Sequence, residues 1–140
     1  MRAEGLGVAL SATDGIDIAH WYLNPPGDIR SSYALEVTAN EYTCQGLELD
    51  FVGVCWGGDF VRNPTDGRWA FRRLSGPKWQ IVKEGANRQF IKNSYRVLLT
   101  RARESLVIWV PKGDREDKTR DPAHLDATAE FLVQCGARMS

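Results

Sequence analysis

Two polar segments about fifty residues apart carry the side chains best suited to chemistry. The first is Gln45-Gly46-Leu47-Glu48, and the second is Thr100-Arg101-Ala102. A guanidinium such as that of Arg101 stays protonated and offers a fork of donors that suits the oxygens of a phosphoryl group. Glycine at position 46 permits a tight turn or a close approach of the backbone to a ligand. A plainer interpretation stays open, in which Arg101 is a surface ion-pair partner and Gly46 an ordinary turn residue.

The sequence lacks the residues that would grip a nucleoside triphosphate. It contains no Gly-x-x-x-x-Gly-Lys-Ser/Thr loop, whose backbone amides cradle phosphates in other proteins. No Asp-Glu pair follows an apolar strand to hold magnesium, and Glu116-Asp117 lies in a charged segment. The three cysteines are widely spaced and the histidines are only two, which is unsuited to a metal site. We therefore expect no metal and no tightly bound cofactor.

Charge is distributed unevenly, although the formal net charge is zero. Residues 1–67 hold 3 basic and 10 acidic side chains, residues 68–103 hold 10 and 1, and residues 104–140 hold 5 and 7. The block 68–103 would attract a polyanion. An ordinary solvated face is an equally open interpretation, because residues that cluster along a sequence need not cluster in space.

Length and composition predict a single globular domain over residues 1–140. Hydrophobic residues make up 43% and charged residues 26% of the 140, which are ordinary values. No run approaches the length of a membrane span, and no basic-then-apolar leader begins the chain. An odd, scattered set of cysteines fits a reducing compartment, so we expect a cytoplasmic location.

The hydrophobic pattern predicts several short strands. Single strands are expected at residues 16–23, 34–37, 51–56, 79–83 and 106–110. Those at 51–56 and 106–110 are continuous apolar runs, which is typical of strands buried on both faces. Trp56 and Trp109 are accordingly expected in the core. Residues 60–74 are expected to form a hairpin around the turn 63–67.

Two helices complete the expected elements. Apolar residues at intervals of four, three and four predict a helix over residues 87–104. A second helix is expected to begin at the cap Asp121 and to stop near Gly136. Residues 112–120 between them are highly charged, and we expect a mobile loop there. The alternation of strands and helices predicts an α/β domain with a mainly parallel sheet and an inserted antiparallel hairpin.

In this order and at this spacing, the two polar segments resemble the late motifs of superfamily 1 helicases, which lie in the second of two RecA-like domains. Residues 45–48 match the glutamine-glycine loop, residues 50–54 the strand after it, and residues 100–102 the core of the last motif. The chain resembles the schlafen-like helicase domain family in particular. That resemblance also rests on Gly57-Gly58-Asp59 and on residues 93–101, and it covers roughly residues 2–112.

The resemblance implies a RecA-like sheet flanked by helices, placed beside an ATP and Mg²⁺ that a separate Walker-bearing domain holds. Arg101 would be an arginine finger, and further nucleotide contacts would come from Gln45, Gly46, Glu48 and Thr100. The side chains expected to contact DNA or RNA are Arg72, Arg73, Lys92, Arg96 and Arg103. The chain alone should not hydrolyse ATP, because it lacks the triphosphate grip and the magnesium ligands.

Two alternatives to a helicase half stay open. One is a non-catalytic module that binds nucleic acid through the block 68–103. The other is a docking module for a separate Walker-bearing protein. No membrane partner is expected.

Overall fold

The computed structural model describes residues 17–36 and 38–139. The chain divides into two compact units, Met1–Glu48 and Leu49–Ser140, and each is described by itself. None of the helices within the described residues has the length and apolar composition needed to cross a membrane.

The first unit contains two short helical elements where strands were expected. Helix α1 spans Ile18–Leu23 and begins at Asp17, whose carboxylate accepts hydrogen bonds from the N–H groups of Ala19 and His20. This cap satisfies N–H groups that a helix leaves unpaired, which explains why residues 17–23 are not a strand. The 3-10 helix η2, Ser32–Ala34, ends at Leu35 with a φ of 57°, a value that a strand does not permit. The strands predicted over 16–23 and 34–37 are therefore wrong, although Ile16 and Val37 lie outside the described residues.

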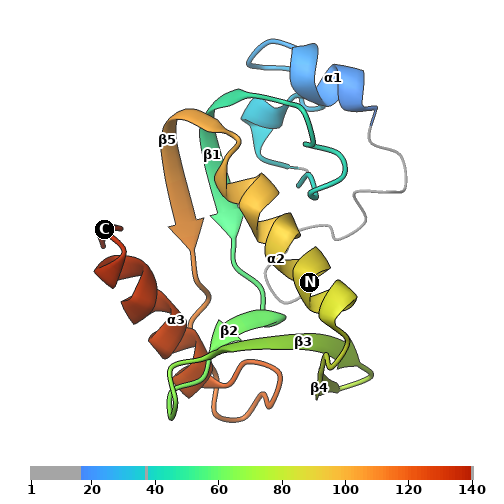
Figure 1. The fold of residues 1–140 in the computed structure, drawn as a ribbon. Helices are drawn as coiled ribbons and strands as arrows, with labels where there is room; N and C mark the ends of the chain where they lie inside the picture. The colour runs from blue at the N-terminus through green and yellow to red at the C-terminus, as the bar shows by residue number, and fades with distance from the viewer. Residues whose placement is uncertain (1–16, 37, 140) are drawn as a thin grey trace. The chain divides into compact units, whose positions relative to one another are not determined.

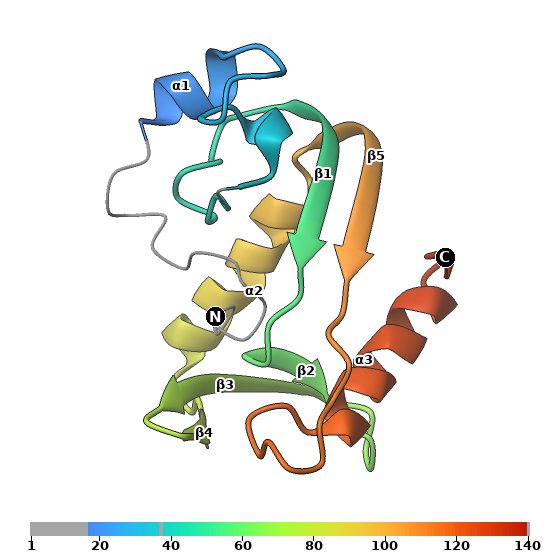
Figure 2. The same cartoon turned by 180° about the vertical axis from the view of Figure 1, so that it is seen from behind.

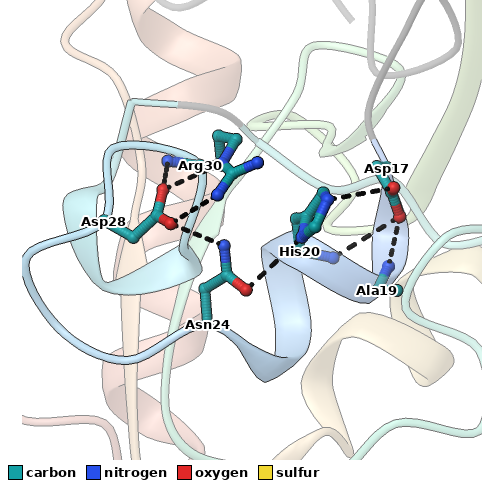
Figure 3. A network of polar contacts seen from close by, with 6 residues as sticks. All are labelled: Asp17, Ala19, His20, Asn24, Asp28 and Arg30. Carbon is teal, nitrogen blue, oxygen red and sulfur yellow. Dashed lines mark hydrogen bonds and ion pairs between the residues drawn. The ribbon is translucent and has the colours of Figure 1, made fainter.

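A chain of polar contacts ties α1 to the turn that follows it (Figure 3). His20 lies between Asp17 and Asn24, and the amide of Asn24 donates to Asp28 at 2.8 Å. Arg30 donates to both carboxylate oxygens of Asp28, at 3.0 and 2.8 Å. The hydrogen bonds from the side chain and the backbone N–H of Arg30 hold the pKa of Asp28 well below its ordinary value. Pro26 and Gly27 form a turn after α1.

The second unit contains two small sheets (Figure 1). Strands β1, Leu49–Cys55, and β5, Ala102–Trp109, form a parallel pair. Strands β2, Phe60–Arg62, β3, Trp69–Ser75, and β4, Lys78–Ile81, form an antiparallel sheet in that order. The predicted α/β class, the hairpin and the strand near Trp79 are confirmed. The prediction of a mainly parallel sheet is wrong, because only two of the described strands are parallel.

The helices of the second unit differ in how well the sequence predicted them. Helix α2 spans Gly85–Leu99 and is shorter than the predicted helix 87–104, because residues 102–104 already belong to β5. Helix α3, Pro122–Gln134, starts after the cap Asp121 and is followed by Gly136 at a φ of 103°, as predicted. The segment 112–120, expected to be mobile, is closed on itself by hydrogen bonds.

The parallel pair is buried on one face only, so the expectation of two buried faces is wrong. Val54 of β1 is buried, whereas Phe51 and Val107 are 69% and 65% exposed. Trp109, expected in the core, is 41% exposed. Side chains alternate between the faces of a strand, so an apolar run in the sequence does not itself establish that both faces are covered.

An aromatic core lies between the two sheets. Trp56, Phe60 and Tyr95 are buried, and the side chains packed against them are Trp69, Phe71, Ile91, Leu99, Ile108, Val110 and Leu132. The rings of Trp56 and Tyr95 lie 4.5 Å apart, and those of Phe60 and Trp69 lie 4.1 Å apart. The antiparallel sheet crosses beyond the arrowheads of β1 and β5 in both views (Figures 1 and 2). The core therefore fills the carboxyl end of the parallel pair.

Candidate functional site

Arg101 lies at the junction between helix α2 and strand β5. The helix ends at Thr100, whose N–H donates to the carbonyl of Val97 at 3.2 Å. The half-buried Arg101 side chain turns back along this last helical turn, where its Nε donates to the Val97 carbonyl at 3.0 Å. Its Nη2 donates to Oγ1 of Thr100 at 3.1 Å. The guanidinium is thus held in a defined place at the end of the helix.

The backbone of Arg101 belongs to the amino end of the parallel pair. Its carbonyl accepts a hydrogen bond of 2.9 Å from the N–H of Leu49, the first residue of β1. Leu49 is paired with Ala102, the first residue of β5. Strand β1 therefore begins beside Arg101, directly after Glu48 in the sequence.

The glutamine-glycine segment forms a turn in the first unit. Asn40 opens it, because its side-chain oxygen accepts from the N–H groups of Tyr42 and Thr43 at 3.0 and 2.9 Å. Gly46 has a φ of 82°, which lies in the region that favours glycine. Gln45 and Glu48 are exposed. These three predicted nucleotide contacts belong to a different unit from Arg101 and Thr100, and their roles stay predictions.

Four of the predicted nucleic-acid contacts are exposed on the second unit. Lys92 and Arg96 are four residues apart on α2 and so lie on one side of that helix. Arg73 is exposed on β3. Arg103, at the start of β5, is 3.0 Å from a carboxylate oxygen of Asp50. Because both side chains are exposed, this ion pair contributes little stability. Arg103 can therefore exchange Asp50 for another anion.

Arg72, the fifth predicted contact, is only 8% exposed. Its Nε donates to the carbonyl of Gly58 at 2.9 Å, and its guanidinium carbon lies 5.1 Å from the centre of the Trp79 ring. Burial lowers the pKa of Arg72, and the nearby charges of Asp121 and Asp59 oppose that effect. This geometry favours a structural part for Arg72 over a contact with nucleic acid.

Tyr95 makes contacts that the sequence did not indicate. Its hydroxyl donates to Asp59 at 2.7 Å and accepts from the N–H of Gly57 at 3.0 Å. Its sequence signals were its place on the apolar face of the predicted helix and within residues 93–101, which carry the family resemblance, and neither indicated these contacts. The Gly57-Gly58-Asp59 segment is thereby fixed to α2.

The sequence supplies neither the lysine loop nor the acidic pair that hold a triphosphate and its magnesium. Across residues 17–36 and 38–139, no group of three or more His, Cys, Asp or Glu side chains is arranged to hold a metal ion.

Comparison with protein-family models places the chain in the helicase-related class, for which nucleic acid is the expected ligand. The model of the Schlafen group 3, DNA/RNA helicase domain matches residues 10–112, and the chain belongs to this family. The matched span includes both polar segments and every predicted site residue, and it ends before α3. Neither a comparison with curated proteins nor one with solved structures finds a match.

Proposed function

We propose that this chain is the second RecA-like half of a superfamily 1-type helicase core, in which Arg101 acts on ATP held by a separate Walker-bearing domain. The observation that carries the proposal is the position of Arg101, where α2 ends and the amino ends of β1 and β5 are hydrogen-bonded. The family membership supports a helicase-related role. The finger role and the two-domain arrangement are our inference.

In the second unit, the edge of the parallel pair best suited to meet a nucleotide is the amino edge, where β1 and β5 begin. Open α/β sheets commonly bind ligands at the carboxyl ends of their strands. Here the aromatic core fills that end, with Trp56 following β1 directly and donating from Nε1 to the Phe60 carbonyl at 2.6 Å. Arg101 lies at the opposite end of the same pair. A nucleotide held by another domain would therefore be met at the amino edge.

The chemistry assigned to Arg101 follows from its guanidinium and its support. Phosphoryl transfer spreads negative charge over the transferred group, and an arginine finger that stabilises this charge raises the rate by about 10³–10⁵. Thr100 donates from Oγ1 to the carbonyl of Arg96 at 2.8 Å while accepting from Nη2 of Arg101. This support reduces the freedom that Arg101 would lose on meeting a phosphate.

The remaining predicted residues take supporting roles in the proposal. Gln45, Gly46 and Glu48 would contact the nucleotide from their turn, with Glu48 accepting from ribose hydroxyls. DNA or RNA would lie against the exposed basic side chains of the second unit, namely Arg73, Lys92, Arg96 and Arg103. We leave Arg72 out of this set because it is buried.

A phosphate-release assay tests the half-site proposal. The purified chain should release no phosphate from ATP, with or without DNA or RNA, because it lacks the triphosphate grip. Joining it to a Walker-bearing domain of the same family should restore turnover. Robust turnover by the chain alone, abolished in Arg101→Ala but kept in the exposed control Arg115→Ala, would overturn the half-site view.

A second candidate function is nucleic-acid binding without nucleotide chemistry. It is favoured by the exposure of every basic residue in the block 68–103 except Arg72 and Arg101. Binding of this kind would persist without ATP and without a second domain. The two candidates therefore separate in the joined protein, since only the first gives ATP turnover that depends on Arg101.

A further inference from the structure

We infer that residues 113–134, named here the C-terminal clamp, are an integral part of the folded second unit although they lie outside the family match. The match ends at residue 112, just after β5. The clamp consists of a hydrogen-bonded loop and helix α3. It closes the outer edge of β2 and packs on the aromatic core. Neither contact depends on the proposed action on ATP.

The loop of the clamp is fixed by its own polar side chains. Asp117 accepts from the N–H and the hydroxyl of Thr119 at 2.9 and 2.6 Å. Arg120 donates from Nε to Asp117 at 3.1 Å and from Nη2 to Asp114 at 3.0 Å. The backbone N–H of Asp114 donates to the Arg120 carbonyl at 2.8 Å, which closes the loop. These contacts give the loop one defined conformation.

Trp79 of β4 tethers the loop to the antiparallel sheet. Its indole Nε1–H donates to the carbonyl of Thr119 at 2.7 Å. The same ring packs so closely on Gly58 that a Cβ there would lie 2.5 Å from it. The Arg72 guanidinium covers the ring at 5.1 Å. The loop is thus joined to the segment that follows β1.

Helix α3 provides a hydrogen-bond partner for the backbone of β2. Strand β2 is an outer strand of its sheet, and the N–H of Arg62 donates at 2.9 Å to Oγ1 of Thr128. Thr128 is 0% exposed and donates in turn to the carbonyl of His124 at 2.7 Å. An outer strand with unpaired backbone groups is open to pairing with another chain. The hydroxyl of Thr128 therefore accepts a backbone hydrogen bond that a neighbouring strand would otherwise accept.

The same helix also covers the core. The ring of Phe131 meets Trp69 edge-on with 5.3 Å between ring centres, and the Arg62 guanidinium carbon lies 4.3 Å from the Phe131 ring. Leu125 is buried, and Leu132 packs against the aromatic core. Figure 2 shows α3 running beside β2. Loss of this helix would expose both the core and the strand edge.

Amide hydrogen exchange followed by NMR on the full chain tests the clamp. The amides of α3 should exchange with the same free energy of opening as those of β5, because the two elements open together. In Thr128→Val, which keeps the shape and removes the acceptor, the Arg62 amide should exchange about fivefold faster or more, the factor expected for one hydrogen bond. The control Thr65→Val, in an exposed turn, should leave this rate unchanged.

A second variant keeps the inference testable if Thr128→Val fails to fold. Trp79→Phe keeps an aromatic ring and removes the indole donor, so the amides of Thr119 and Arg120 should exchange about fivefold faster or more. Unchanged rates in both variants would overturn the clamp. So would α3 amides that exchange at the rate of an unfolded peptide while β5 stays protected.

Discussion

Tyr95 joins helix α2 to the segment that follows β1. Its hydroxyl donates to Asp59 and accepts from Gly57, and its ring is buried against Trp56. A Cβ at position 57 would collide with the Asp59 carboxylate. The glycine, the tyrosine and the aspartate therefore depend on one another, and all three lie in segments that carry the family resemblance.

Removing this hydroxyl should destabilise the second unit. Tyr95→Phe leaves the buried N–H of Gly57 and a carboxylate oxygen of Asp59 without their partner, which costs about 1–3 kcal/mol. Urea unfolding followed by tryptophan fluorescence measures the loss. The matched control is Tyr33→Phe, whose ring is exposed in the first unit. Equal stability of the two variants would show that the Tyr95 hydroxyl contributes nothing.

Among the elements, those with local signals were predicted best. Helix α3 has a capping aspartate, a proline in its first turn and a following glycine, and its boundaries agree with the prediction. The sequence pattern does not predict helix α1, because Trp21 and Tyr22 favour a strand there, whereas the structure has a helix capped by Asp17. The pattern does not predict the start of β5 either. Its first residues include Arg103 and Glu104, which are polar and exposed, so the apolar pattern begins only later.

Features that depend on distant segments were not predictable in this way. The sequence does not indicate which strands pair. The structure has two separate sheets where a single sheet was predicted. The hydrogen bond between Leu49 and Arg101 depends on the register of β1 and β5, which periodicity alone did not give. The burial of Arg72 results from packing against Trp79 and Gly58. The two polar segments, by contrast, are recognisable in the sequence, because their order and spacing resemble the late motifs of superfamily 1 helicases.

The loop of the C-terminal clamp should lose stability in acid. Hydrogen bonds from the hydroxyl and N–H of Thr119, and then from Arg120, lower the pKa of Asp117 from 3.8 to about 2. Because the folded pKa is the lower one, the stabilisation is complete above pH 3.8 and is lost as the pH falls towards 2. Thermal unfolding at a series of pH values should therefore show a smaller acid decline in Asp117→Asn. The exposed control Asp126→Asn should show the same acid decline as the unchanged protein. An acid decline in Asp117→Asn as large as that of the unchanged protein would contradict this prediction.

For the whole molecule, the basic block 68–103 predicts that binding of nucleic acid weakens as the salt concentration rises. Neutralising phosphates releases counterions, so the logarithm of the binding constant falls with the logarithm of salt concentration, by about 0.7 per contact for single strands and 0.9 for duplexes. Lys92→Ala and Arg96→Ala should each reduce this slope by about that amount. Fluorescence anisotropy with labelled DNA and RNA at several salt concentrations measures it. The control Arg115→Ala lies outside the block and should not change the slope, and a slope that is unaffected by Lys92→Ala and Arg96→Ala would exclude these contacts.

In the proposed function, Arg101 acts on ATP that a separate Walker-bearing domain holds. Single-turnover hydrolysis by the chain joined to a Walker-bearing domain tests it most directly, because that measurement isolates the chemical step from nucleotide binding. We predict that Arg101→Ala lowers the single-turnover rate by about 10³-fold or more while ATP affinity changes little. Arg101→Lys should recover only part of the rate, since an ammonium lacks the forked donors of a guanidinium. A rate in Arg101→Ala equal to that of Arg115→Ala would contradict the account.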